Sequence, residues 1–204
     1  KGRNAMGNQV TKYPIKSVKW KEAGKATLSG KQYWFDTQFG RLNVEEKGLS
    51  LGGFEPNDQL IVFYRDGYYE ITDQELTQKF EAEKVMLIEK FVPECIVSAV
   101  YLDKKLGQFN VKRFKIETTT LRNKFLFIKE GEGNYVAAVT TQPEPVLAVQ
   151  QGRGAQVRKA KFKIEKVTEI TGWKTVGTKL LDYTKTVEME WVKTKPELQS
   201  KLFD

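Results

Sequence analysis

The side chains of this sequence that could take part in chemistry are mainly lysines and arginines. They number 34 among 204 residues against 26 aspartates and glutamates, which gives a formal net charge of +8. Histidine is absent, so Ser-His-Asp and Cys-His nucleophile systems and imidazole metal ligands are excluded. The single cysteine, Cys95, cannot form an intrachain disulfide or build a zinc site alone. We expect it to be a buried small hydrophobe in a reducing, cytoplasmic setting.

Carboxylates offer a second kind of chemistry, because two opposed carboxyl groups can hydrolyse a glycosidic bond. Asp36, Glu45, Glu46 and Asp73 are the acidic candidates, but no spacing among them singles out a pair. A carbohydrate-active enzyme on a β scaffold therefore remains an alternative that needs a cleft with two opposed carboxylates.

The positive charge is concentrated in two blocks near the ends of the sequence. Residues 1–31 contain eight basic residues and one acidic residue, and residues 151–179 contain eight basic and two acidic residues. The 119 residues between these blocks are net acidic. Patterned charge of this kind suggests a polyanionic partner such as nucleic acid, although a lysine-rich surface can also serve solubility alone.

Short runs rich in valine, isoleucine, phenylalanine, tyrosine and threonine predict an all-β fold. Examples are residues 32–35, 60–64, 84–88 and 124–128. Asp66-Gly67 between two such runs predicts a hairpin, since glycine readily adopts the positive φ of a tight turn. Only residues 73–83 and the tail after Lys195 are compatible with a short helix. The most apolar stretch, residues 96–102, is too short to span a bilayer, so we expect no membrane partner.

The chain also repeats itself at intervals of about 40 residues, a period typical of four-stranded blades arranged radially. Gly67 and Gly107 are 40 residues apart, and the segment 111–116 resembles the segment 160–164. We expect about four blades over residues 1–192, followed by a tail over residues 193–204. If the blades close into a disc, the first and last become neighbours and the two basic blocks merge.

Alternate residues of a strand share a face, which places cations together on two of these strands. Arg113 and Lys115 share one face, opposite Lys112, and the segment 159–163 has lysines at every second position. Several cations on one strand face suit a phosphate backbone, while an ordinary solvated face is the alternative. Adding the basic loops at either end of the chain, the candidate DNA-binding residues are Lys1, Arg3, Lys12, Lys16, Arg41, Lys112, Arg113, Lys115, Arg153, Arg158, Lys159, Lys161, Lys163, Lys174 and Lys179.

Four segments together resemble a known family. They are Lys1-Gly2-Arg3-Asn4-Ala5-Met6-Gly7-Asn8, residues 58–67 (DQLIVFYRDG), residues 110–114 (NVKRF) and residues 172–177 (GWKTVG). Their order and spacing resemble the C-terminal domain of bacterial type IIA topoisomerase A subunits, with topoisomerase IV first and DNA gyrase second. The gyrase box reads roughly Gln-Arg-Arg-Gly-Gly-Lys-Gly, and only Arg3 and Gly7 of residues 1–7 match it. That departure favours bending of DNA over full wrapping.

The resemblance implies a β-pinwheel, a propeller-like disc whose blades exchange strands and whose basic rim binds duplex DNA. It implies a domain without catalytic residues, cofactor or metal, because the catalytic tyrosine and the sites for ATP and Mg²⁺ lie elsewhere in such enzymes. The implied partners are the rest of the A subunit and the ATPase B subunit in a heterotetramer, in the bacterial cytoplasm at the nucleoid. A β-propeller that binds an acidic protein is the alternative from another functional class.

Overall fold

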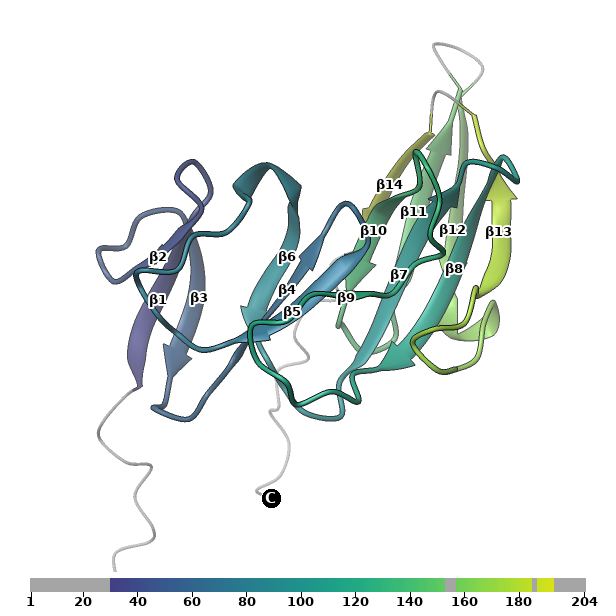
Figure 1. The fold of residues 1–204 in the computed structure, drawn as a ribbon. Coiled ribbons are helices and arrows are strands. Elements are labelled where there is room, and N and C mark those ends of the chain that lie inside the picture. Colours follow the sequence, from purple (N-terminus) through teal and green to yellow (C-terminus); the bar gives the residue numbers. More distant parts are fainter. Residues whose placement is uncertain (1–29, 153–156, 185–186, 193–204) are drawn as a thin grey trace, which may run out of the picture.

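The computed structural model describes residues 30–152, 157–184 and 187–192, and within them every regular element except two short 3-10 turns is a β-strand. The strands form four antiparallel sheets that stand side by side in a row (Figure 1). The predicted all-β fold with about four blade-like repeats is therefore confirmed. No helix among the described residues is long and apolar enough to cross a membrane.

Sheets 1 and 2 come first along the chain. Sheet 1 has the order β2-β1-β3 and sheet 2 the order β6-β4-β5-β9. The strands are β1 (Lys31–Asp36), β2 (Arg41–Asn43), β3 (Leu49–Phe54), β4 (Leu60–Tyr64), β5 (Tyr68–Thr72), β6 (Val85–Lys90) and β9 (Phe125–Leu126), with a 3-10 turn, η1 (Ala82–Lys84), before β6.

Sheets 3 and 4 complete the row. Sheet 3 has the order β10-β7-β8-β13 and sheet 4 the order β12-β11-β14. The strands are β7 (Ile96–Asp103), β8 (Gln108–Lys115), β10 (Tyr135–Thr140), β11 (Val146–Gln151), β12 (Arg158–Lys163), β13 (Thr178–Asp182) and β14 (Val187–Trp191), with a second 3-10 turn, η3 (Ile164–Lys166), after β12.

Neighbouring sheets are joined by exchanged strands. The outer strand of sheet 2, β9, belongs to the connection between β8 and β10 of sheet 3. In the same way β13, the outer strand of sheet 3, belongs to the connection between β12 and β14 of sheet 4. Sheet 1 receives a shorter exchanged segment from the connection between β5 and β6 of sheet 2. In it, Lys79 forms a β-bridge to Arg41, and the amide of Phe80 donates to the carbonyl of Gly40. Each of these three sheets is thus completed by the unit that follows it.

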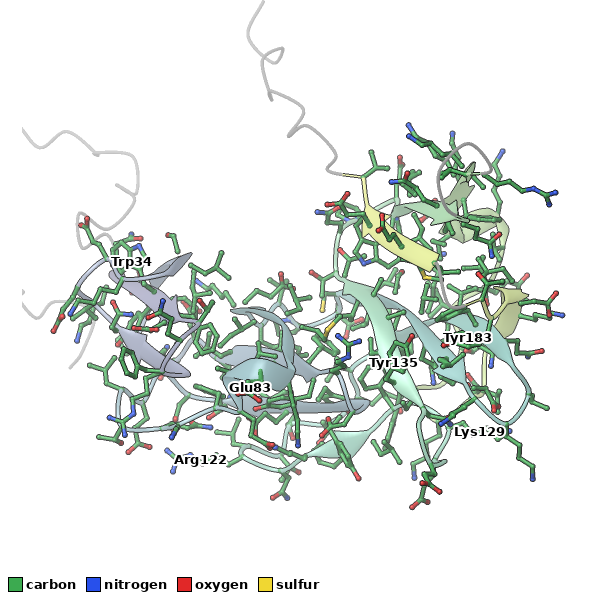
Figure 2. The ribbon with its side chains drawn as sticks, turned by 90° about the horizontal axis from the view of Figure 1, so that it is seen from above. Trp34, Glu83, Arg122, Lys129, Tyr135 and Tyr183 are labelled. Atoms are coloured by element: carbon green, nitrogen blue, oxygen red, sulfur yellow. The ribbon has the colours of Figure 1, made fainter. Side chains whose placement is uncertain are left out.

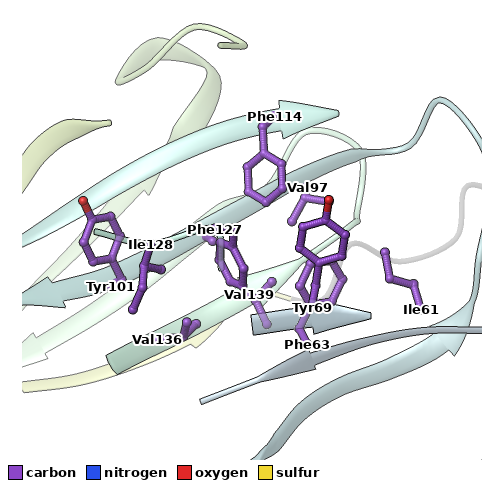
Figure 3. Packing of buried hydrophobic residues seen from close by; sticks show 11 residues of the cluster. Ile61, Phe63, Tyr69, Val97, Tyr101, Phe114, Phe127, Ile128, Val136 and Val139 are labelled. Atoms are coloured by element: carbon purple, nitrogen blue, oxygen red, sulfur yellow. The ribbon is translucent and has the colours of Figure 1, made fainter. Parts of the chain in front are cut away.

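Apolar side chains fill the spaces between consecutive sheets. Aromatic and aliphatic residues fill the central cluster between sheets 2 and 3, where Phe127 packs against Phe63 and Phe114 with ring centroids 5.8 and 5.5 Å apart (Figure 3). Tyr69 and Trp173 extend the cluster, since their rings meet edge to face at 6.1 Å. This burial of large aromatic surface holds the exchanged segments in place.

Sequence and structure agree on the hairpin at Gly67, whose φ is +89° and whose amide donates to the carbonyl of Tyr64. They differ over residues 73–83, where the structure has no α-helix and only the 3-10 turn η1 begins, at Ala82. The reason is that Lys79 and Phe80 are drawn to sheet 1, where Phe80 is buried against Phe35. The other candidate helix, after Lys195, lies outside the described residues.

The row of sheets is open in the described part of the chain. Sheet 1 lies at one end, near Trp34, and sheet 4 lies at the other, so these two sheets are not neighbours (Figures 1 and 2). The expected closure into a disc is therefore not seen among the described sheets. The intervals between the sheets vary around the predicted period of about 40 residues, since the first strands of the sheets begin at residues 31, 60, 96 and 146. The later connections are longer because they contain the exchanged strands.

Candidate nucleic-acid interface

Strand β12 carries the densest group of exposed cations among the described residues. Arg158, Lys159, Lys161 and Lys163 all lie on this strand of six residues, and the side chain of each is exposed. Three of them stand at alternate positions and therefore share a face of the sheet. At about 3.3 Å per residue, the lysine row from 159 to 163 extends over roughly 13 Å.

That face points away from the rest of the molecule. Leu147 and Val149 of β11 point the other way and pack against Val100 and Leu102 of sheet 3. The lysines pair with the β11 residues that alternate with Leu147 and Val149, as Lys161 does with Ala148. Directly paired residues share a face of the sheet, so the lysines point outward. We call this outward surface of sheet 4 the end face. Its residues are Val146, Ala148 and Gln150 on β11, Lys159, Lys161 and Lys163 on β12, and Glu188 and Glu190 on β14.

None of the four β12 cations forms an ion pair with a carboxylate of the described residues, whereas many of the other lysines and arginines there do. Sheet 4 also differs from its neighbours because no exchanged strand among the described residues covers the outer edge of β12. The row is therefore open to solvent on its face and along its edge. Uncompensated adjacent cations repel one another, and an anionic ligand relieves that repulsion.

Two further candidates lie in exposed ion pairs on sheet 3. Lys115 at the end of β8 is 2.5 Å from Glu94, and this hydrogen bond lowers the pKa of the Glu94 carboxyl. Lys179 on β13 is 2.7 Å from Asp182. Surface pairs of this kind contribute at most about 1 kcal/mol, so a phosphate can replace the carboxylate at small cost.

The remaining described candidates lie apart from the lysine row. Lys174 places its Nζ 5.0 Å from the centre of the Trp173 ring, beside a hollow of about 500 Å³ that Lys124 and Lys129 also line. Arg41 is exposed on sheet 1, at the far end of the row from β12. The structure therefore brings together the β12 residues but leaves Arg41 separate from them.

Lys112 is not on the surface, which corrects its place among the DNA-binding candidates. Its side chain is fully buried, and its Nζ donates to the backbone oxygens of Phe127, Trp173 and Thr175 at 2.7, 2.6 and 2.5 Å. Burial lowers the pKa of the Lys112 ammonium to about 8. The three carbonyls satisfy all three ammonium donors, so this cation acts inside the fold.

Arg113 also departs from its expected exposed position. Its side chain is 9% exposed, and Nη2 lies 2.9 Å from Glu165 Oε1 in η3. The cause is the connection between β12 and β14, which runs past β8 and bridges Arg113 to Ile170. This guanidinium is therefore committed to Glu165 and is closed to a large ligand.

The candidates Lys1, Arg3, Lys12, Lys16 and Arg153 lie outside the described residues, as does most of the first basic block. The expected meeting of that block with residues 151–179 likewise falls outside the described part of the chain.

The exposed cations that the candidate set omits include Lys104 and Lys105, at the turn between β7 and β8. The signal for them was present, because a lysine pair just before Gly107 and between two apolar runs marks a hairpin tip. The candidate set also omits Arg65, whose guanidinium lies 5.1 Å from the centre of the Tyr135 ring. Within the described residues no group of three or more cysteine or acidic side chains could hold a metal ion.

Comparison with known proteins agrees with this picture. One solved structure similar to this chain is the C-terminal domain of DNA topoisomerase IV, with a TM-score of 0.51 and 13% identity. The similarity covers 72% of this chain and 51% of the solved chain, so this chain spans about half the length of that domain. At this identity the likeness shows the fold alone, and it supports the β-pinwheel architecture.

Sequence comparison is more specific. No curated protein matches the chain. A family model described as topoisomerase C-terminal domain, Bacteroidota, matches residues 41–190, which is well over half of the sequence. The match includes sheets 2 and 3, sheet 4 up to residue 190, and strands β2 and β3 of sheet 1, while β1 lies before it. Because this model covers well over half of the sequence, and the strand exchange between the sheets agrees with it, the chain belongs to the family of topoisomerase C-terminal domains of Bacteroidota.

Proposed function

We propose that this domain binds duplex DNA through phosphate contacts that do not depend on sequence, and that it bends the duplex to guide strand passage. The observation that carries the proposal is the lysine row of β12, Lys159, Lys161 and Lys163, whose three exposed cations have no carboxylate partner among the described residues. Lysine and arginine contacts to phosphates supply position and affinity but little base discrimination.

The parent enzyme in this proposal is an ATP-dependent type IIA topoisomerase, either topoisomerase IV or gyrase, in the bacterial cytoplasm. The domain would belong to its A subunit and would work with an ATPase B subunit, with ATP and Mg²⁺ bound outside this chain. Bending is part of the proposal because the sheets form a curved row (Figure 2), and DNA that extends from the lysine row of β12 along this curve would gain contacts that offset its deformation energy.

The test compares two triple variants with the wild-type chain, using fluorescence anisotropy of two unrelated duplexes between about 50 and 200 mM salt. The first variant is K159Q/K161Q/K163Q. The control, K47Q/K84Q/K124Q, removes the same charge from lysines that are ion-paired to carboxylates. Counterion release predicts that the first variant lowers the slope of log affinity against log salt by about 2 to 3 for both duplexes.

A row variant that binds both duplexes like the wild-type chain would show that the phosphates bind elsewhere. A wild-type chain that fails to retard duplex DNA at physiological salt would instead support an acidic protein partner. Bending has its own readout, the energy transfer between dyes at the two ends of a bound duplex, which rises only if the ends approach each other.

A further inference from the structure

The end face of sheet 4 carries two parallel rows of opposite charge. Glu190 of β14 and Lys161 of β12 lie on either side of Ala148, because both residues pair with it in the register. Glu188 and Lys159 lie on either side of Gln150 in the same way. All four charged side chains are exposed.

The backbones of the two rows are separated by the full width of β11. Adjacent strands are about 4.8 Å apart, so the rows run roughly 10 Å from each other across β11. No ion pair joins them in the described structure. The carboxylates therefore leave the lysines without a partner among the described residues. They add negative potential on the β14 side of the end face, next to the strands at which neighbouring sheets meet.

From this division we infer that Glu188 and Glu190 are positioning residues that confine bound DNA to the outer part of the end face, over β12. The inference rests on the proposed function. A duplex lying over β12 meets the lysines alone, whereas a duplex displaced toward β14 brings its phosphates close to two carboxylates. Ala148 raises no large side chain between Lys161 and Glu190, and the exposed Gln150 between Lys159 and Glu188 is uncharged. The charge of the two carboxylates is therefore the feature that opposes an inward position of the phosphates.

The repulsion between the two carboxylates and the DNA phosphates has a size and a salt dependence that follow from the distance between these charges. Two unit charges about 10 Å apart in water interact enough to change affinity by about twofold, before screening. Two carboxylates facing several phosphates thus change duplex affinity by about three- to tenfold at low salt. The screening length is about 8 Å at 0.15 M, so the effect shrinks as salt rises.

The affinity test uses E188Q/E190Q and a control of equal charge, E130Q/E132Q, which neutralises two exposed glutamates in the connection before β10. Anisotropy at about 50 mM salt should show three- to tenfold tighter duplex binding for E188Q/E190Q and a change below about twofold for the control. The gain should shrink at about 200 mM. Equal gains in both variants would mean that net charge alone matters and would overturn the inference.

A second readout reports position directly. A photo-crosslinker is attached to Gln150→Cys in a Cys95→Ser background, so that the probe stands between the two rows. We expect weak crosslinking to duplex DNA in this chain and several-fold stronger crosslinking once E188Q/E190Q is added. Strong crosslinking before that addition, or none after it, would contradict confinement.

Failure of the inference can be told apart from failure of the proposed function. If K159Q/K161Q/K163Q weakens binding but E188Q/E190Q leaves affinity and crosslinking unchanged, the DNA site stands and the positioning role is wrong. If the lysine variant binds like the wild-type chain, the lysine row is not the DNA site and the positioning role falls with it.

Discussion

The Nζ of Lys112 lies 2.6 Å from the backbone oxygen of Trp173, 61 residues further along the chain. The same ammonium also donates to Phe127 and Thr175. Phe127 follows the exchanged strand β9, and Trp173 and Thr175 precede the exchanged strand β13. One buried cation on β8 therefore fastens both exchanged segments to sheet 3.

Replacing this cation should destabilise the fold. Lys112→Met leaves three backbone oxygens without their donor, and each buried unsatisfied polar group costs about 1 to 3 kcal/mol. We expect a loss of about 2 to 4 kcal/mol in the free energy of unfolding, measured by urea denaturation. Lys115→Met, on the same strand but exposed, should cost less than about 1 kcal/mol. Equal losses for the two variants would show that the carbonyl contacts contribute little.

The stability contributed at Lys112 should depend on pH. Its pKa is about 8 in the folded chain and near 10.5 in the unfolded chain. Between these values the unfolded chain holds a proton that the folded chain has released, so the free energy of unfolding rises with pH. Between pH 7 and 9.5 we expect the wild-type chain to gain about 1 to 3 kcal/mol relative to Lys112→Met. Parallel pH profiles for the two chains would refute the lowered pKa.

Two glycines in equivalent turns should respond differently to alanine. A Cβ on Gly67, where φ is +89°, would stand 2.3 Å from Cγ1 of the buried Ile128, whereas a Cβ on Gly107, where φ is +62°, meets no atom within 4 Å. Gly107→Ala should cost about 1 to 2 kcal/mol from backbone strain alone. Gly67→Ala should cost about 1 to 3 kcal/mol more because of the clash. Equal midpoints in urea would contradict this difference.

Arg113 should affect stability rather than DNA binding. Arg113→Met removes the bond to Glu165 but leaves that half-exposed carboxylate in contact with water, so we expect a loss of about 1 to 2 kcal/mol. Duplex affinity should stay within about twofold of the wild-type value. Lys161→Met should show the reverse, with weaker binding and nearly unchanged stability. A large loss of duplex affinity in an Arg113→Met chain that is fully folded would show that Arg113 belongs to the DNA interface.

The all-β fold, the hairpin at Gly67 and the exposure of the β12 lysines could be predicted from strand periodicity and turn residues. The burial of Arg113 could not. The segments 111–116 and 160–164 look alike in sequence, yet β8 is covered by β13 and the connection before it, while β12 has no such cover among the described residues. The covering residues lie more than 50 positions downstream of Arg113, beyond the reach of local pattern. Tertiary contacts also explain the missing helix over residues 73–83, because Phe80 packs against sheet 1 instead.

The exchange of strands also sets an order of events during synthesis. The strands β4, β5 and β6 of sheet 2 are complete at Lys90, but its outer strand β9 ends only at Leu126. At about 5 to 20 residues per second, a ribosome needs roughly 2 to 7 s to make those further residues. During that interval β5 has an unpaired edge on the nascent chain, and sheets 1 to 3 each reach their full width only as the next sheet is being made.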